Sequence, residues 1–524
     1  MAHRTALLFL ALLVLLSAMP AGAQISVTTA QYDNARTNGN LNETTLNTSN
    51  VNVNHFGKLY TRRLDGYSYT LPLYVPNLKF HGKLHNVVFV ATMHDSVYAF
   101  DADTASSSQP LWKTSLGTPL ATHFPVSPYI QPEIGILSTP VIDPSTNTLY
   151  AVAVTSTDQI TPSLSLHALD LLTGAEKFNG PVQIQAQVIG ATGPVVYDPH
   201  TIVQRTALLL VGGAVYLGFA DATPSVAWHG WVMGYSASDL RKQTAVFNTT
   251  PNGASGGIWQ SGRGLAADAN GYIYLMDSDG DYDGVSNFSD AFLKLATPAL
   301  TVADWFTPSD FSELNTDDLD LGSSGPILIP GTNRIVGGGK NGMVYLLNSA
   351  AMGHLQSSSS GPLQSFLATA GCSSGGTCAE IHSTALWNCA GSPVLYVWGW
   401  NDTLRGYRMA NGLFNTQEFA ESAVTSAYPG GGITLSASGC TSGTGIVWST
   451  TSPDNTYTYI GSDVVRAFDA ETLQELWNSN QNAARDGAGN IAKFMEPMVA
   501  NGKVYVPTFS KELVVYGLLP KSRK

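Results

Sequence analysis

Residues 86–112 contain the stretch that decides the fold: NVVFVAT at 86–92, VYAFDAD at 97–103 and LW at 111–112. The first two runs alternate small and large apolar residues, which is the two-residue period of a β-strand with packed side chains on both faces. A short polar turn joins them, and the third element adds an aromatic residue. This three-part phrase predicts one sheet of a repeating β architecture.

The phrase recurs along the chain. Further copies contain the runs TLYAVA (148–153), AVYLGF (214–219), YIYLM (272–276), MVYLLN (343–348), VLYVW (394–398) and YTYIG (457–461). Repeats of about 50 residues with short strands are typical of propeller blades, and helical periodicity is almost absent. The sequence therefore predicts an all-β protein, a β-propeller of four-stranded blades.

An eighth unit is incomplete at the C-terminal end. It contains KVYVP (503–507) and LVVYGLL (513–519), and the chain then ends without an outer strand. The run FGKLYTR (56–62) has the pattern of the outer strands elsewhere. Pairing the two termini in one blade would close the ring and remove its exposed edges. We therefore expect eight blades over residues 56–519 as one domain; the alternative is seven blades, with one copy an insertion.

The run VYAFDADT (97–104) followed by PLW (110–112) resembles the repeat of the pyrroloquinoline-quinone-type propellers. That family contains quinoprotein alcohol dehydrogenases and outer-membrane assembly lipoproteins. The chain is also similar to secreted bacterial proteins of unassigned activity that carry this repeat. The resemblance covers the chain from about Phe56 onward. It implies the fold and does not choose between an enzyme and a binding module, because one scaffold hosts both.

The N-terminal residues predict export. Arg4 precedes an apolar run at 7–16, and small residues at 21–23 fit a signal-peptidase site. The run is shorter than the roughly 20 residues of a membrane-spanning helix, and no later segment is long and apolar enough to span a bilayer. We expect a signal peptide at 1–23, an N-terminal extension at 24–55, a C-terminal tail at 520–524, and a secreted or periplasmic location without a membrane span.

Charge narrows the possible partners. Charged residues make up 12% of the chain and the net charge is −12, without a cluster of Lys or Arg. This balance argues against nucleic acid and against anionic membrane surfaces as partners. A small molecule, a glycan or a protein remains as the expected partner.

The four cysteines lie in the C-terminal half. An even count in an exported chain favours disulfides, and four cysteines allow three pairings. The short Gly/Ser loop between Cys372 and Cys378 favours that pair, which leaves Cys389 with Cys440. No paired CxxC motifs are present, so a zinc site is not expected.

Each predicted blade has a polar segment before its innermost strand, where propellers expose the mouth of the central channel. The residues that would converge there are Glu133, Arg205, Trp259, Arg263, Asp320, His382 and Glu496. Mixed charges beside a tryptophan suit a planar, anionic or polar ligand, through stacking and charge-assisted hydrogen bonds. The alternative is that these groups pair with one another and hold the blades together.

One acidic loop has the spacing of a calcium site. Asp279, Asp281 and Asp283 occupy positions one, three and five of a twelve-residue loop with Gly at position six. The carbonyl of Val285 is available at position seven, and Asp290 stands at position twelve. Hard oxygen ligands at this spacing can surround Ca²⁺. Position twelve is Asp instead of Glu and the loop joins strands, so the alternative is a solvated polar hairpin.

The resemblance implies further groups for a quinone-dependent dehydrogenase: a calcium ion, a carboxylate base and often a disulfide of adjacent cysteines. The chain has no adjacent cysteines and no CxxCH haem-attachment motif, and its carboxylates cannot be matched to the family's catalytic ones. GxSxG, HExxH and P-loop motifs are absent as well. We therefore expect an exported ligand- or partner-binding propeller. The alternative is a quinone-dependent oxidoreductase acting on a small alcohol or sugar, with pyrroloquinoline quinone as cofactor.

Overall fold

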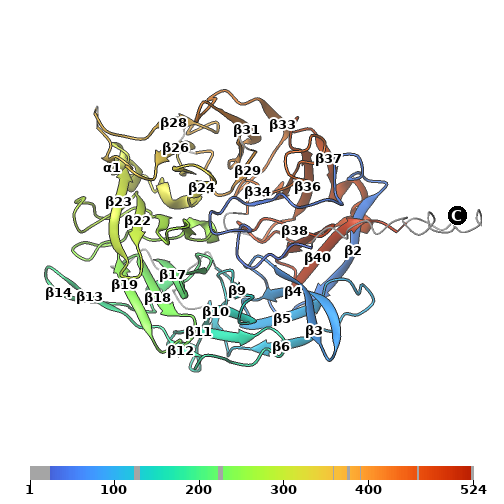
Figure 1. The fold of residues 1–524 in the computed structure, drawn as a ribbon, viewed down its shortest axis with the longest axis horizontal. Coiled ribbons are helices and arrows are strands. Elements are labelled where there is room, and N and C mark those ends of the chain that lie inside the picture. Colours follow the sequence, from blue (N-terminus) through green and yellow to red (C-terminus); the bar gives the residue numbers. More distant parts are fainter. Residues whose placement is uncertain are drawn as a thin grey trace, which may run out of the picture.

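The computed structural model describes residues 24–122, 130–221, 228–357, 359–373, 378–389, 391–456 and 460–520. Eight sheets stand around one central channel, as Figure 1 shows in a view down that channel. This confirms the eight-bladed β-propeller; the seven-bladed alternative is wrong. The expected signal peptide at 1–23 lies outside the described residues.

Seven blades are formed by consecutive strands, numbered here from the innermost outward. Blade one consists of β3 (Leu73–Phe80), β4 (Lys83–Ala91), β5 (Ser96–Asp101) and β6 (Trp112–Ser115), and blade two of β9 (Val141–Asp143), β10 (Thr148–Thr155), β11 (Ser163–Asp170) and β12 (Val182–Gln183). Blade three consists of β15 (Ile202–Val203) with β16 (Leu209–Val211), then β17 (Ala214–Asp221), β18 (Trp231–Ser236) and β19 (Gln243–Asn248). Blade four consists of β20 (Ala266–Ala267), β21 (Ile273–Met276), β22 (Phe292–Ala296) and β23 (Thr301–Thr307).

Blades five to seven consist of β24 (Ile327–Ile329), β25 (Arg334–Gly338), β26 (Met343–Asn348) and β28 (Gln364–Leu367); β29 (Thr384–Trp387), β30 (Val394–Trp398), β31 (Thr403–Ala410), β33 (Ala420–Thr425) and the short β32 (Leu413–Phe414); and β34 (Gly432–Ser436), β35 (Ile446–Thr451), β36 (Val464–Asp469) and β37 (Glu475–Asn478). The minor elements are β1 (Gly39–Asn40), β7 (Leu120–Ala121), β8 (Glu133–Ile134), β13 (Gln187–Gly190), β14 (Gly193–Val196), β27 (His354–Leu355), α1 (Phe311–Thr316), α2 (Ala483–Asp486), and the 3₁₀ turns η1 (Gln260–Gly262), η2 (Leu321–Ser323) and η3 (Ser479–Asn482).

Blade eight joins the two ends of the chain. Its strands are β38 (Met498–Ala500), β39 (Lys503–Pro507) and β40 (Glu512–Leu518), and its outer strand is β2 (Phe56–Arg63). The β2–β40 pairing is antiparallel, with Phe56 opposite Leu518. The expected closure of the ring by the N-terminal strand is confirmed.

The alternating pattern of the repeat explains how the blades pack. In β5, Val97 and Ala99 pack toward blade two, in one cluster with Leu149. Tyr98 and Phe100 point to the opposite face, in a cluster shared with blade eight. Both faces of each sheet are therefore buried against a neighbouring blade, which is why the strands are apolar at successive positions.

The N-terminal extension lies inside the channel, which the sequence did not predict. We call residues 25–43 the plug. Figure 1 shows this blue segment crossing the middle of the ring. Its main chain bonds to inner strands in succession: Val27 pairs with Tyr74 in blade one, and the carbonyl of Thr28 accepts from Ile142 N–H in blade two at 2.7 Å.

The plug continues around the axis. Side chains of Asn34 and Arg36 donate to main-chain carbonyls of blade three, and the carbonyls of Asn34 and Ala35 accept from blades four and five. The carbonyl of Thr37 accepts from blade six, and β1 within the plug pairs in parallel with β34 of blade seven. The Asn40 side chain donates to Val499 O in blade eight at 3.1 Å. The plug thus contacts every blade.

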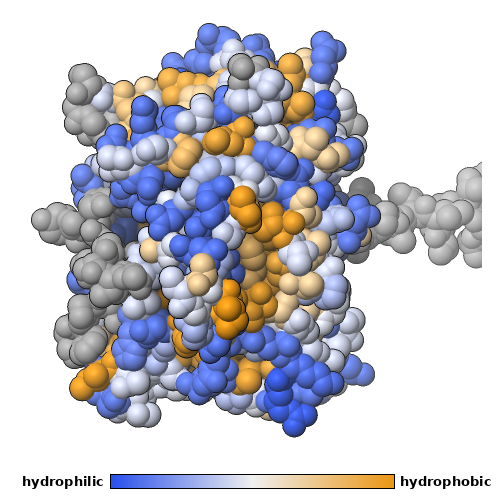
Figure 2. Space-filling view, turned by 90° about the vertical axis from the view of Figure 1, so that its left-hand side faces the viewer, coloured by the Kyte–Doolittle hydropathy of each residue, from blue (hydrophilic) through white to orange (hydrophobic). Residues whose placement is uncertain are grey.

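On the side of the β13–β14 hairpin, apolar residues lie at the outer surface. Figure 2 shows hydrophobic residues gathered there between hydrophilic ones. Ile189 and Val196 of that hairpin are exposed. Within the described part of the chain, no helix is long and apolar enough to cross a membrane.

Candidate functional site

The mouth of the channel is formed by the loops that lead into the innermost strands and by the loops between second and third strands. All seven predicted ligand-binding residues lie in the loops that lead into these strands. Arg205, Arg263 and Glu496 are 2% exposed and lie deep in the channel. Trp259 and His382 belong to its aromatic lining, and Asp320 lies between blades four and five. Glu133 pairs with His94 across blades one and two, at 3.0 Å.

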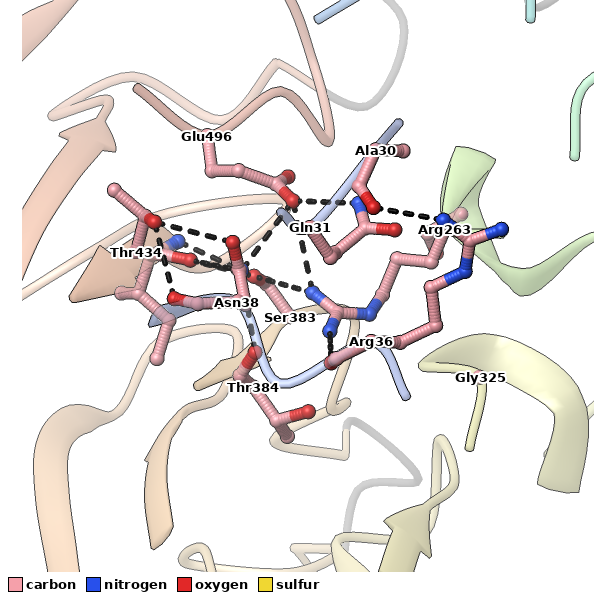
Figure 3. Close-up of polar contacts among 12 residues, drawn as sticks. Ala30, Gln31, Arg36, Asn38, Arg263, Gly325, Ser383, Thr384, Thr434 and Glu496 are labelled. Atoms are coloured by element: carbon pink, nitrogen blue, oxygen red, sulfur yellow. Dashed lines mark hydrogen bonds and ion pairs between the residues drawn. The ribbon is translucent and has the colours of Figure 1, made fainter. Parts of the chain in front are cut away.

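Glu496 is the acceptor at the centre of a buried network. Arg263 Nη1 lies 3.7 Å from Glu496 Oε1. The same oxygen accepts from Gln31 Nε2 at 2.8 Å and from Asn38 Nδ2 at 3.3 Å (Figure 3). Two of these donors come from the plug. Arg263 and Glu496 therefore pair with each other and with the plug.

The other buried arginines bind main-chain oxygens. Arg205 Nη1 donates to Tyr69 O at 3.1 Å and Leu137 O at 2.9 Å. Arg36 donates to Leu265 O and Ala30 O, each at 2.7 Å. Burial lowers the pKa of Arg205 to about 10 and that of Arg36 to about 9, so both stay charged at neutral pH. Arg36 lies in a polar stretch with the composition of a linker, so the sequence did not predict it as a site residue.

Above this network lies an aromatic cluster, which we call the platform: Trp259, Trp400, Tyr428 and Phe494. The Phe494 ring centroid lies 6.1 Å from that of Trp259 and 5.9 Å from that of Tyr428. Trp400 meets Tyr428 edge-on at 5.2 Å. Trp259, Trp400 and Phe494 remain partly exposed at the mouth.

The platform rests on strained backbone. Phe494 has a φ of +65°, a conformation that is rare for a bulky residue. Next to Trp259, Gln260 and Ser261 have φ values of +46° and +49°, followed by Gly262 at +86°. Such strain is costly and tends to persist at functional sites. Nothing in the local sequence of Phe494 indicates it.

His382 lies directly beneath the platform. Its ring centroid is 4.9 Å from that of Phe494. Nδ1 lies 2.9 Å from Ser261 Oγ, and Nε2 lies 2.8 Å from Glu380 Oε2. A Ser–His–carboxylate order can form a nucleophile, but the hydroxyl of Ser261 is fully buried and donates to Ser323 O at 2.7 Å. This arrangement is therefore a structural bridge between blades.

Carboxylates gather between blades four and five. Lys340 Nζ binds Asp320 at 2.6 Å. Burial followed by the charge of Asp320 raises the pKa of Asp279 to about 8, and the same causes raise that of Asp290 to about 8. Burial alone would raise the pKa of Asp320 as well, but the Lys340 ammonium keeps it below its ordinary value. Asp279 and Asp290 can therefore hold or release a proton near neutral pH.

The predicted calcium loop is divided between two environments. Asp283 accepts from the main-chain N–H groups of Val285, Ser286 and Asn287, so it caps its own turn. Asp281 accepts from Ala254 N at 2.9 Å, and Val285 is 84% exposed. Asp279 and Asp290 face Asp320 instead. Within the described ranges no group of three or more His, Cys, Asp or Glu is placed to hold a metal. The cage that the spacing predicts is not assembled, because main-chain N–H groups bind the carboxylates of Asp281, Asp283 and Asp290.

The structure contains both expected disulfides, Cys372–Cys378 and Cys389–Cys440. The first closes a loop between β28 and β29 at the mouth, and the second joins blades six and seven. Two disulfides fit a secreted or periplasmic protein.

No protein-family model matches the sequence, and no curated protein is significantly similar to it. Among solved structures, the europium-containing methanol dehydrogenase superposes with a TM-score of 0.60 at 12% identity, covering 94% of this chain and 98% of that one. The quinohemoprotein alcohol dehydrogenase ADHIIG from Pseudomonas putida HK5 gives 0.58 at 13%, covering 94% and 80%. The quinohemoprotein alcohol dehydrogenase from Comamonas testosteroni gives 0.52 at 13%, covering 95% and 82%.

These identities are low, so the likeness concerns the fold. The repeat resemblance, the eight radial sheets and the three superpositions agree on one architecture. The chain has the quinoprotein-like eight-bladed propeller fold.

Proposed function

We propose that the mouth binds a flat or ring-shaped ligand, a small molecule or the sugar unit of a glycan, which stacks on the platform. The observation that carries this proposal is the pair Trp259 and Phe494, partly exposed beside strained backbone at the mouth. Partly exposed aromatic side chains favour planar ligands, because such ligands can stack on them.

The buried network supports the same assignment. Arg205, Arg263 and Glu496 are buried and contact main chain and plug, so they shape the floor; Arg205 Nη2 and Arg263 Nε have no hydrogen-bond partner among the described residues. Recognition then depends on stacking and on the polar groups at the rim, such as Lys493. Burial lowers the pKa of Lys493 to about 8, so this ammonium sits in a poorly solvated position.

Saturation-transfer NMR tests the assignment with a defined panel: pyrroloquinoline quinone, glucose, cellobiose and a mixture of soluble glycans. We expect transfer to at least one ring-shaped compound, and loss of it by tenfold or more in Trp259→Ala and Phe494→Ala. Ile189→Ala, on the exposed β13–β14 hairpin, is the control and should bind as the unmodified protein does. Equal binding by all variants would place the ligand elsewhere.

The second candidate is a quinone-dependent oxidoreductase acting on a small alcohol or sugar. The specific observation in its favour is a carboxyl group beside the mouth, Asp279, whose pKa of about 8 suits proton transfer near neutral pH. The three structural neighbours are named as alcohol or methanol dehydrogenases. The fit to a metal-bound quinone is poor, because the buried arginines are engaged and the described residues offer no metal cage.

Reconstitution decides between the two. The protein would be incubated with pyrroloquinoline quinone and Ca²⁺ or a lanthanide, and dye reduction would be followed with a panel of alcohols and sugars. Stoichiometric quinone binding with turnover that is lost in Asp279→Asn would establish the oxidoreductase. Ligand binding without turnover would leave the binding module.

A further inference from the structure

His382 lies where four blades meet at the floor of the mouth. It belongs to the loop before β29 of blade six, and its partner Ser261 precedes β20 of blade four. Ser261 in turn bonds to Ser323 O, just before β24 of blade five. The ring of Phe494, from blade eight, lies against the imidazole. A change at His382 therefore reaches the platform directly.

Hydrogen counting determines what His382 does. The hydroxyl of Ser261 has one hydrogen, which it donates to Ser323 O at 2.7 Å. The hydroxyl of Ser323 is used on Ile381 O. Since Ser261 Oγ has no second hydrogen, Nδ1 of His382 must be the donor in their 2.9 Å contact. The second ring nitrogen, Nε2, faces Glu380 Oε2 at 2.8 Å.

We infer that His382 and Glu380 hold one shared proton and that this proton positions the platform, which makes His382 a positioning residue of the proposed ligand site. Because the hydrogen on Nδ1 is donated to Ser261, a second proton must lie between Nε2 and the Glu380 carboxylate for that contact to be a hydrogen bond. When it is lost, a lone pair on Nε2 faces a carboxylate oxygen, and the contact becomes repulsive. The imidazole then turns away from Glu380, and Phe494, in edge contact with it, moves too. The effect on ligand binding rests on the proposed function, whereas the proton shared by His382 and Glu380 does not.

Other charged groups surround the pair. Arg263 of blade four approaches Ser383, next to His382 in the chain. The ring of Tyr428, which precedes blade seven, lies 6.0 Å from the His382 imidazole, and Asp318, which precedes blade five, interacts electrostatically with Glu380. The remaining charged or titratable groups of the neighbouring loops are Asp279, Asp320, Lys340, Lys493 and Glu496. Substitution at His382 is therefore needed to separate its proton from the others.

The first measurement needs no ligand. Long-range ¹H–¹⁵N NMR of the imidazoles, with His382 assigned through His382→Gln, reports the protonation of each ring nitrogen. We expect both nitrogens protonated at low pH and the Nδ1–H tautomer after deprotonation. His94→Gln is the matched control, because His94 also pairs through a ring nitrogen with a glutamate, Glu133, but lies in blade one with a side chain that is 49% exposed. A neutral Nε2–H tautomer at His382 would overturn the inference.

The second measurement follows the platform. In protein labelled with 5-fluorotryptophan, the ¹⁹F signal of Trp259 should shift between pH 5 and 9, and the shift should fall at least threefold in His382→Gln and Glu380→Gln. The His94→Gln variant should keep it in full. A shift that persists in His382→Gln would assign the effect to another group and refute the positioning role. Both measurements are made without ligand, so failure of the binding proposal leaves their outcome unchanged.

Discussion

Gln31 Nε2 donates to Glu496 Oε1 at 2.8 Å, although 465 positions separate the two residues in the chain. The contact places the N-terminal plug against the loop that leads into blade eight. The same glutamate lies 3.7 Å from Arg263 of blade four, so one carboxylate connects the plug, blade four and blade eight. The floor of the mouth is therefore built in part by the plug, which lies outside the propeller repeat.

The plug is expected to contribute strongly to stability through Arg36. In Arg36→Met, the oxygens of Leu265, Ala30 and Thr29 lose a buried charged donor, which should cost about 3 kcal/mol of unfolding free energy. Arg241→Met, which removes an exposed pair with Asp239, should leave the free energy of unfolding nearly unchanged. Urea denaturation of both variants measures the difference; equal losses would contradict the structural role of the plug.

Removal of the N-terminal strand should cause aggregation. Deleting residues 24–64 removes both the plug and β2, so β40 becomes an exposed edge with unpaired main-chain groups. Size-exclusion chromatography should show soluble aggregates, whereas a chain lacking only residues 521–524 should elute as the full-length protein does. A deletion variant with the same elution profile as the intact chain would show that β40 needs no partner.

Asp290 and Asp283 should respond to pH with opposite signs. The pKa of Asp290 is raised to about 8 in the folded state, whereas the unfolded chain releases this proton at about pH 4. Between about pH 4 and 8 the free energy of unfolding should therefore fall by up to about 1.4 kcal/mol per pH unit. Asp290→Asn should remove this loss and stabilise the protein at pH 8 more than at pH 5.

Asp283 provides the internal comparison. Burial opposes its ionisation, but main-chain N–H donors prevail and lower its pKa to about 2. Its contribution is present above about pH 4 and is lost as pH falls toward 2, so Asp283→Asn should destabilise at pH 7 and little at pH 2. Thermal melting across pH 2–9 checks both; matching pH profiles for the two variants would refute the assignment.

Calcium should leave the protein's stability unchanged. Asp281 and Asp283 are used by main-chain donors, and Asp279 and Asp290 face Asp320, so the acidic loop presents no converging ligands. The melting temperature with millimolar Ca²⁺, Mg²⁺ or chelator should agree within about 1 °C. A Ca²⁺-specific rise that disappears in Asp281→Asn with Asp283→Asn would restore the site that the spacing predicts.

The two disulfides should differ in their contribution. Chain-entropy reasoning gives about 4 kcal/mol for Cys389–Cys440, which closes 51 positions, and about 2 kcal/mol for Cys372–Cys378, which closes 6. Urea denaturation measures the free energy of unfolding of two double variants: Cys389→Ser with Cys440→Ser, and Cys372→Ser with Cys378→Ser. An equal loss in both would show that strain or residual structure outweighs loop length.

Sequence alone determined the ring. The period of two in runs such as 97–103, repeated along the chain, reports burial on both faces of each strand, and that information is local. Closure by Phe56–Arg63 could be predicted because β2 carries the pattern that blade eight lacks. The disulfide pairs could be predicted from the even number of cysteines and from the short loop between Cys372 and Cys378.

Tertiary structure alone decided the site. The contacts of Glu496 with Gln31, of His382 with Ser261 and of Asp290 with Leu321 N–H span 465, 121 and 31 positions of the chain. The spacing of the acidic loop predicted calcium ligands, but main-chain N–H groups of the same turn donate to the Asp283 carboxylate. Strain at Phe494 and the path of the plug leave no local signal. The reason is physical: strand patterning follows from each residue's own burial, whereas buried polar groups are oriented by whichever partners the closed ring brings within hydrogen-bond distance.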